Sequence, residues 1–207
     1  MRRPFGITIA AFLLLTASCI TVNVPIGGDS ESTAVIWTVS PEEMEKWSVS
    51  CDLVVQIKDF SADPSAQGVQ MTVLNQDGTL NKTATDIWSS RPSEMLPDVL
   101  LRDMISAEAW GAVLRKSTML PEDLIVEGYI RQFGGVVTED KWEAVLDVDV
   151  TVLDGDSYQL VFQENYRFHW ELPVPSYAAM AEAMNVLVGI WTEEVMSDIW
   201  SARLPVR

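Results

Sequence analysis

Cys19 has the most definite chemistry in this sequence, because of the segment that precedes it. Arg2 and Arg3 are followed by an apolar run that begins near Phe5 and ends in Leu-Leu-Leu-Thr-Ala-Ser-Cys. A basic start, a short apolar segment and small residues at its end are typical of a secretory signal peptide. We therefore expect the chain to be exported, with the Cys19 thiol at the point of cleavage.

This segment resembles the lipobox of bacterial lipoproteins, in which the Cys thiol is acylated and the chain is cut immediately before it. The resemblance implies a lipoprotein signal peptide at residues 1–18 and Cys19 as the first residue of the mature protein. It also implies a diacylglycerol and an N-acyl lipid on Cys19, and no other cofactor. The sequence departs from the usual pattern at Thr16, where the family generally has Leu.

Two other interpretations of the N-terminal segment stay open. A membrane-spanning helix at residues 5–15 would be short, since a span needs about 20 apolar residues. Alternatively, the segment is an ordinary cleaved signal peptide and the Cys is a coincidence, because short motifs carry a false-positive risk. We prefer the lipoprotein interpretation, because basic, apolar and small residues occur in the order that it requires.

Composition places the rest of the chain among ordinary globular domains. Of 207 residues, 48% are hydrophobic and 21% are charged, which suits one domain with a sizeable core. The formal net charge is −16, and such a surface repels phosphate backbones and anionic lipid headgroups. We therefore expect no nucleic-acid partner, whereas a basic protein partner stays open.

Cys51 and His169 are the remaining thiol and the single imidazole of the chain. With Cys19 lipidated, Cys51 is alone in an oxidising compartment, either as a reactive or intermolecular thiol or as a small apolar residue near a strand start. We favour the second interpretation. A histidine metal cluster or a Cys–His pair would need His169 alone, so we expect no metal site and interpret His169 as a surface or partly packed residue.

Asp147 and Asp149 are the most suggestive pair of carboxylates. Alternation puts them on one face of a strand, roughly 7 Å apart. Such a pair serves acid–base catalysis or binds Ca²⁺ in some proteins, but on an alternating strand it is usually the solvent-exposed face. The sequence also lacks the nucleophile-elbow, P-loop and dinucleotide-binding motifs. We therefore predict no catalytic residues and no enzymatic activity.

Residues 20–32 are predicted to be a flexible tether, because Gly27, Gly28 and the polar residues after them discourage regular structure. A tether of this length reaches at most about 45 Å, so the folded body is expected to sit close to its membrane. The expected division is a lipidated Cys and tether at 19–32 and a single domain at 33–207.

The first half of the domain reads as strands separated by turn signals. β-branched and aromatic residues predict strands at 33–39 and 51–60. Residues 69–74 and 80–88 flank the sequence Asn-Gln-Asp-Gly and predict a hairpin. The acidic segment 41–47 is predicted to form a short helical turn.

A helical period follows, with apolar residues three and four apart on one face. These residues are Leu96, Val99, Leu100, Met104 and Ala107. We expect Ser90 to cap this helix, a start near Ser93 and an end at Gly111. A short strand at residues 112–115 comes next.

The clearest strands lie in the second half. Residues 124–131 and 144–152 alternate apolar and polar side chains, so one face of each strand is expected to be buried. We expect a bend or bulge at Gly134 and Gly135, a turn at residues 154–156 and a strand at 158–170.

A long apolar stripe marks the last helix, which Ser176 is placed to cap. The stripe comprises Met180, Met184, Leu187, Val188, Trp191, Val195 and Ile199. This helix is expected to pack across the sheet beside the first one. Two helices segregated from the strands predict an α+β, two-layer domain in which two main helices pack on a mixed sheet.

Six of the eight tryptophans divide into two groups by position. Four fall within predicted strands or helices and are expected to pack in the core: Trp88, Trp110, Trp142 and Trp191. Trp37 and Trp47 lie on the side of the tether, and we consider them the better candidates for contact with a partner.

Several blocks, taken in order, carry a likeness to a known family. They are the lipobox, the strand that ends at Asp59-Phe60, the helix entry at 88–98, and the strands at 126–133 and 145–154. Together they resemble the ABC-type transport auxiliary lipoproteins, the lipoprotein component of mammalian-cell-entry and lipid ABC transport systems of Gram-negative bacteria. Trp37 and the acidic insertion at 41–46 depart from the usual pattern and concern the subfamily.

The resemblance implies a fold like the N-terminal domain of TolB and an outer-membrane lipoprotein that faces the periplasm. Ile20 at the second mature position favours the outer membrane, because Asp is the usual signal for inner-membrane retention in enterobacteria. The implied partners are an ABC permease, its ATPase and a mammalian-cell-entry protein, with oligomerisation open. Two alternatives are a hydrophobic-ligand carrier and an envelope scaffold unconnected with an ABC system.

Overall fold

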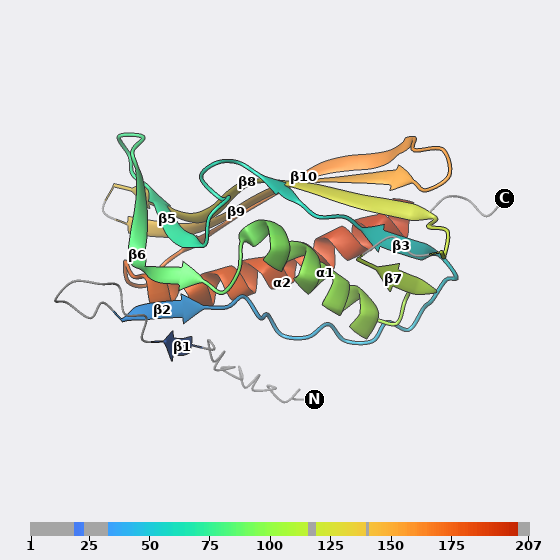
Figure 1. Ribbon diagram of the computed structural model, residues 1–207, viewed down its shortest axis with the longest axis horizontal. Coiled ribbons are helices and arrows are strands. Elements are labelled where there is room, and N and C mark those ends of the chain that lie inside the picture. Colours follow the sequence, from blue (N-terminus) through green and yellow to red (C-terminus); the bar gives the residue numbers. More distant parts are fainter. Residues whose placement is uncertain (1–18, 23–32, 116–118, 140, 203–207) are drawn as a thin grey trace, which may run out of the picture.

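Two layers make up the domain, a long mixed sheet and a pair of helices on one of its faces. The computed structural model describes residues 19–22, 33–115, 119–139 and 141–202. Within them, ten strands form one sheet, and α1 (Pro92–Ser106) and α2 (Tyr177–Ala202) pack against each other and against it. Figure 1 shows the long strands along the upper side and both helices beneath them. The predicted α+β fold is confirmed.

Three long antiparallel strands form the largest part of the sheet. They are β8 (Leu124–Thr138), β9 (Lys141–Asp154) and β10 (Leu160–Glu171). On β9 the alternate residues from Ala144 to Val152 that face the helices are fully buried, as the alternation predicts. The pattern located these strands but underestimated the length of β8, which continues to Thr138.

Short strands complete the sheet along the other edge of β8. β3 (Val54–Ile57), β4 (Ser61–Ala62) and β5 (Gln70–Leu74) pair with β8 in parallel, one after another. Beyond them lie β6 (Leu80–Trp88), β2 (Ala34–Trp37), β1 (Cys19–Val22) and, beside β3, β7 (Ala112–Leu114). The predicted β5–β6 hairpin and the strand at β7 are confirmed, whereas the strand predicted at 51–60 is limited to β3.

The irregularity of β8 lies at Arg131 rather than at the two glycines. The register shifts between Ile130 and Gln132, and Gly134 then pairs regularly with Val145. A Cβ on Gly134 would lie 2.5 Å from the carbonyl oxygen of Thr72 in β5. The glycine therefore permits close approach of β5 to β8, and the prediction of a bend there is wrong.

The ends of α1 differ from those expected. The helix begins at Pro92 with Arg91 in the capping position and no side-chain cap, so Ser90 is not the cap. Proline is well suited to the first turn, where its missing N–H needs no partner. The helix ends at Ser106 rather than Gly111, and Glu108 then adopts a φ of 48°.

α2 matches its sequence pattern closely. The Ser176 hydroxyl oxygen accepts a hydrogen bond from the Ala179 backbone N–H at 3.1 Å, and every residue of the predicted apolar stripe is buried. The Tyr166 hydroxyl of β10 donates to Asp198 of α2 at 2.7 Å. Burial, with that carboxylate as a second cause, raises the pKa of Tyr166 above its ordinary value. Within the described residues, no helix has the length and hydropathy needed to cross a bilayer.

A buried carboxylate joins the two helices. Asp103 of α1 is 1% exposed, and its oxygens accept hydrogen bonds from the Thr192 hydroxyl at 2.9 Å and from the Arg102 guanidinium at 2.6 and 2.9 Å. A buried charge is tolerated when it is paired and hydrogen-bonded in this way. Asp103 therefore fixes how α1 lies against α2.

Two N-terminal segments depart from the expectations. Residues 41–47 have no regular structure, although the Trp47 backbone N–H donates to the Ala107 carbonyl oxygen just after α1. The predicted lipidation position and the first three residues of the predicted tether form β1, Cys19–Val22. Residues 1–18 and 23–32 lie outside the described residues, so the signal peptide and the proposed domain division stay predictions.

The packing of α2 predicts a large difference between two neighbouring positions. Leu187 is 1% exposed against the sheet, whereas Ile190 is 36% exposed. We expect Leu187→Ala to lower the free energy of unfolding by about 2–5 kcal/mol through lost burial and a cavity. Ile190→Ala is expected to cost less than about 1 kcal/mol. Urea unfolding followed by tryptophan fluorescence measures both, and equal losses would show that this stripe is not the buried face.

Candidate functional site

Cys19 lies at the edge of the sheet. It is the first residue of β1, where its backbone is the register partner of Trp37 in β2. β2 in turn pairs in parallel with β6 through Trp37 and Trp88. The predicted lipidation position is thus joined directly to the folded domain by backbone pairing.

Cys51 and His169 do not form a site. Cys51 is a half-buried free thiol just before β3, and β3 pairs with the first residues of β8, Leu124 to Val126. His169 is exposed and pairs with Val145 of β9, which pairs with Gly134 of β8. Ten residues of an extended strand separate the two positions along β8, about 30 Å. A Cys–His nucleophile pair is therefore excluded.

The two strand carboxylates are already paired. Asp149 accepts from the Arg131 guanidinium at 2.7 Å and Asp147 lies 3.5 Å from that of Arg167, while the Asn165 amide donates to both carboxylates at 2.8 and 2.9 Å. The hydrogen bond and the charge of Asp149 raise the pKa of Arg131. Asp147 is only 8% exposed, so the expected solvent-exposed face is in fact covered by these longer side chains.

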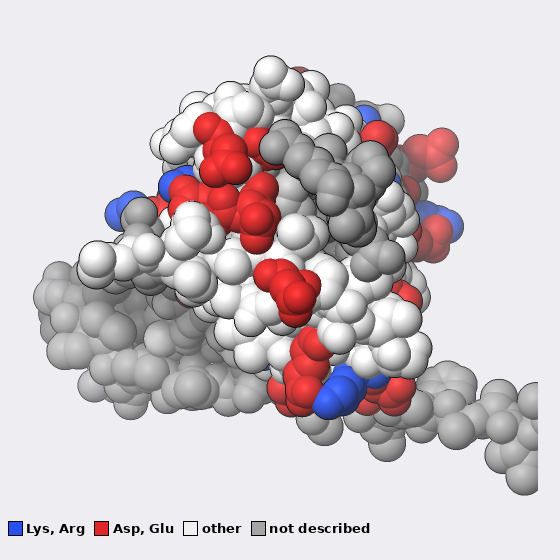
Figure 2. All heavy atoms as spheres, turned by 90° about the vertical axis from the view of Figure 1, so that its right-hand side faces the viewer, with Lys and Arg blue, Asp and Glu red and all other residues white. Residues whose placement is uncertain are grey.

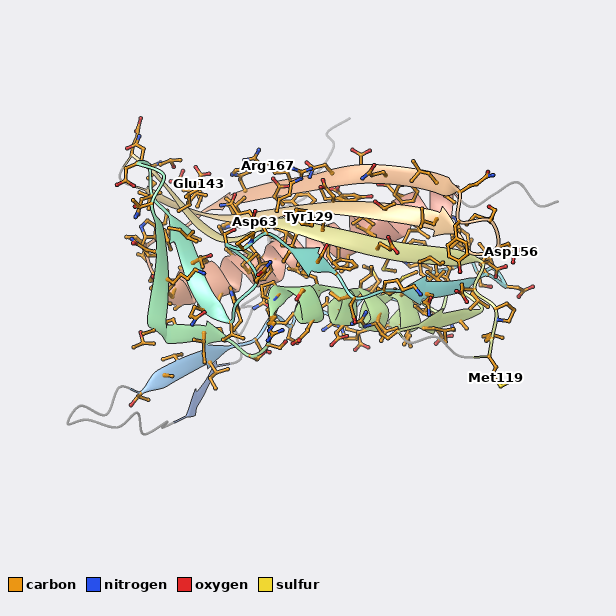
Figure 3. The ribbon with its side chains drawn as sticks, turned by 45° about the horizontal axis from the view of Figure 1, so that its top comes forward. Asp63, Met119, Tyr129, Glu143, Asp156 and Arg167 are labelled. Atoms are coloured by element: carbon orange, nitrogen blue, oxygen red, sulfur yellow. The ribbon has the colours of Figure 1, made fainter. Side chains whose placement is uncertain are left out.

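The pairs continue along the outer face of β9 and β10. His169 Nδ1 lies 3.2 Å from Glu143, and Lys141 lies 2.7 Å from Glu171. Figure 3 shows Glu143, Arg167 and Tyr129 on this side of the sheet, away from the helices. We call the residues Arg131, Asp147, Asp149, Asn165 and Arg167 the outer strip. In the part of the chain that the structure describes, no group of acidic, Cys or His residues is arranged to hold a metal ion.

The partners within the outer strip are what sequence reasoning missed. Arg167 lies directly opposite Asp147 in the β9–β10 register, but that register follows from a longer loop at 154–159 and a shift between Leu160 and Phe162, neither of which the predicted turn at 154–156 includes. The pair of Arg131 and Asp149 depends on the bulge at Arg131, for which the sequence carries no signal.

Trp37 and Trp47 both pack against other parts of the domain. Trp37 is 9% exposed and its indole N–H donates to Asp86 at 3.2 Å. Trp47 is half-buried, with its ring centroid 5.4 Å from that of Trp110 and 5.8 Å from that of Trp200. Trp37 therefore has little surface left for a partner, and a partner contact at Trp47 stays a prediction. Packing of the four tryptophans expected in the core is confirmed: Trp88, Trp110 and Trp191 are buried, and Trp142 is half-buried against Tyr177.

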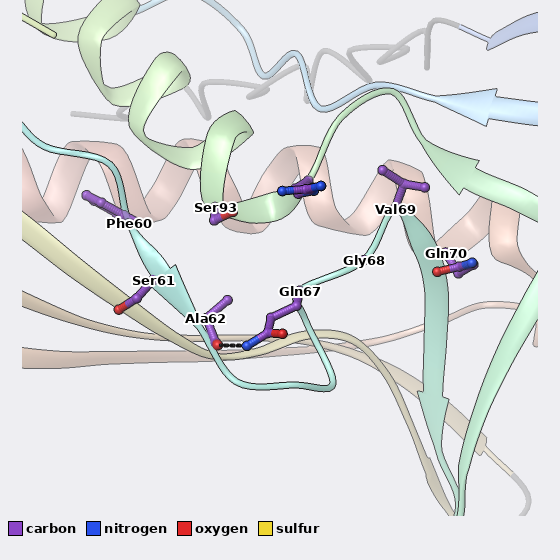
Figure 4. Close-up of a pocket in the computed structure, with 9 residues that line it drawn as sticks. Phe60, Ser61, Ala62, Gln67, Gly68, Val69, Gln70 and Ser93 are labelled. Atoms are coloured by element: carbon purple, nitrogen blue, oxygen red, sulfur yellow. Dashed lines mark hydrogen bonds between the residues drawn. The ribbon is translucent and has the colours of Figure 1, made fainter. Parts of the chain in front are cut away.

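The space between sheet and helices is filled by side chains. Met180, Met184 and Trp191 of α2 are fully buried there. A cavity of about 660 Å³ lies instead between β4, the segment after it and the start of α1 (Figure 4). Most of its lining side chains are polar: Ser61, Gln67, Gln70, Arg91 and Ser93. An acyl chain needs a mainly apolar pocket, so this cavity does not suit a lipid tail.

The fold and the position of Cys19 define the structural class of this protein. The described residues form a two-layer α+β domain with a filled core, joined by backbone pairing to the position of a predicted lipid anchor. The chain belongs to the family of ABC-type transport auxiliary lipoprotein components, which matches residues 38–195. The family inferred from the sequence blocks is thus confirmed, and it is a family of auxiliary transport components.

Solved structures share the fold at low sequence identity. A Xanthomonas campestris protein of family DUF330 is 15% identical with a TM-score of 0.73, covering 81% of this chain and 95% of its own. An uncharacterised protein is 12% identical with a TM-score of 0.61, and the match covers 76% of this chain and 99% of that protein. A hypothetical Chlamydia trachomatis protein is 10% identical with a TM-score of 0.53, and the match covers 72% of this chain and 96% of that protein. No curated protein sequence matches significantly. The likeness to TolB stays a prediction.

The pairing within the outer strip predicts that it does not bind cations. Because Asp147 and Asp149 already accept hydrogen bonds from Arg131, Arg167 and Asn165, added Ca²⁺ would have to displace charged partners. We expect millimolar Ca²⁺ and a chelator to leave the melting temperature unchanged. A rise in melting temperature with Ca²⁺ that Asp147→Asn abolishes would show instead that the strip is a cation site.

Proposed function

We propose that this protein is an outer-membrane lipoprotein, anchored through acylated Cys19 on the periplasmic face. In this proposal it is a non-catalytic accessory subunit of an ABC-type transporter that moves lipids or other hydrophobic molecules across the periplasm. It docks a mammalian-cell-entry protein that spans the envelope. The observation that carries the proposal is the family match over residues 38–195 behind a lipobox-like segment that ends at Cys19.

The position of β1 supports a short link between membrane and domain. Since Cys19–Val22 pair with β2, acyl chains on Cys19 would hold the β1–β2 edge of the sheet close to the lipid surface. Each buried CH₂ contributes about 0.8 kcal/mol, and more than one acyl chain gives stable anchoring. The domain needs no membrane-spanning segment of its own for this role.

The filled core supports an accessory role rather than an independent carrier role. The interior positions that a lipid would occupy hold Met180, Met184 and Trp191, and the cavity beside α1 is largely polar. We therefore assign the passage of hydrophobic cargo to the partner proteins. The envelope-scaffold alternative differs only in its partners, so identifying the partners decides between them.

Substituting each of the two cysteines in turn tests whether Cys19 anchors the protein. We expect Cys19→Ala to abolish acylation and move the protein from the outer-membrane fraction to the soluble or inner-membrane fractions. In the same cells, we expect much less of the permease, the ATPase and the mammalian-cell-entry protein to co-purify. The reason is that the protein would no longer be held at the membrane where it meets these partners.

Cys51→Ala is the matched control, since it removes the other thiol from a half-buried position far from β1. It is expected to keep both membrane location and partners. Full outer-membrane recovery and full transport with Cys19→Ala would disprove the anchor. Retained anchoring without any of the three partners would support the scaffold alternative and rule out the transport role.

A further inference from the structure

The most exposed apolar side chains of the described residues gather at one end of the molecule. Met119 and Leu120 lie in the loop before β8, and Tyr158 and Leu160 lie in and after the loop that joins β9 to β10. Met119, Tyr158 and Leu160 are 103%, 66% and 60% exposed, the three highest values among large apolar residues. We call these four residues the apolar tip.

Backbone hydrogen bonds fasten the two loops together. The Gly155 N–H donates to the Asp123 carbonyl oxygen at 2.8 Å, and the Asp123 N–H donates to the Val54 carbonyl oxygen at 2.8 Å. The Asp123 carboxylate in turn accepts from the Val54 N–H at 2.7 Å. A side chain on Gly155 would overlap the carbonyl oxygen of Glu122, so the contact requires glycine. The loops are therefore held to each other and to β3.

The turn between β9 and β10 holds Tyr158 in a backbone conformation that residues other than glycine rarely adopt. Its φ is 56°, and its N–H donates to the Asp154 carbonyl oxygen at 2.9 Å. The Asp154 carboxylate accepts from the backbone N–H and the hydroxyl of Ser157 at 2.8 and 2.6 Å. Such backbone strain persists where surrounding contacts impose it, and it clusters at functional positions. The result is a rigid loop that presents an aromatic ring to solvent.

The surroundings of the apolar tip are acidic. Asp52, Asp123 and Asp156 are exposed beside it and Glu122 is half-buried, and residues 48–53, 119–123 and 154–160 contain no Lys or Arg. Figure 2, which looks onto this end, shows acidic side chains spread over it with little basic charge. Figure 3 labels Met119 and Asp156 at this same end.

We propose that the apolar tip is a docking surface for a protein face with an apolar centre and a rim of Lys and Arg. The turn that carries Tyr158 is held by hydrogen bonds, so it loses little conformational freedom on binding, and an exposed aromatic side chain is a common anchor of such interfaces. The acidic rim opposes an anionic membrane surface and a second copy of this same end, because like charges would meet. The surface is independent of which transport system the protein serves.

Site-specific photo-crosslinking in cells tests this surface in the full chain. Benzoylphenylalanine replaces Tyr158, and Val174, which is 55% exposed ahead of α2, is the matched control position. We expect protein adducts at position 158 to exceed those at 174 several-fold. Neutralising the rim with Asp52→Asn and Asp156→Asn should lower the adducts about threefold or more, since charge complementarity governs encounter.

The proposal is overturned by equal adducts at the two positions, by adducts with lipid or with a second copy of the chain, or by adducts that rim neutralisation leaves unchanged. The replacement keeps an aromatic L-residue at a surface position. Leu160, 60% exposed in the same tip, provides a second crosslinking position with the same expected dependence on the rim.

Discussion

The structure depends on the packing of one helix against one face of one sheet. α2 contacts β8, β9 and β10, and its buried residues meet the inner residues of β9, which are fully buried from Ala144 to Val152. α1 is fixed to α2 through Asp103 and Thr192. Because both helices occupy the same face, the opposite face has to be stable in water without a covering layer, and the outer strip meets this requirement with paired charges.

Sequence periodicity predicted an element correctly wherever the local pattern of apolar residues agrees with the burial of those residues in the fold. The alternation of β9, the stripe of α2 and the cap at Ser176 were all predictable, because each depends on residues close together in the chain. The end of α1, the irregular segment at 41–47 and the bulge at Arg131 were not predictable. Each is decided by contacts between distant segments, such as the Trp47 backbone with Ala107. The packing of Trp37 and Trp47 against residues distant in the sequence was not foreseen for the same reason.

A filled core and charge-paired outer strip leave the ends of the domain for function. Figure 1 shows β1 and β2 toward one end and β3 and β7 at the other. A lipid on Cys19 would hold the first end at the membrane, and the apolar tip beside β3 would then extend into the periplasm. Under the proposed function, the protein is a rigid body with a lipid anchor at one end and a separate docking surface at the other.

The intact mass of the protein purified from outer membranes tests the central claim most directly. Cleavage before Cys19 and acylation of that residue predict the mass of residues 19–207 plus one diacylglycerol and one N-acyl chain. A mass that includes residues 1–18, or a mature chain with an unmodified Cys19, would contradict the lipid anchor on which the proposed role rests.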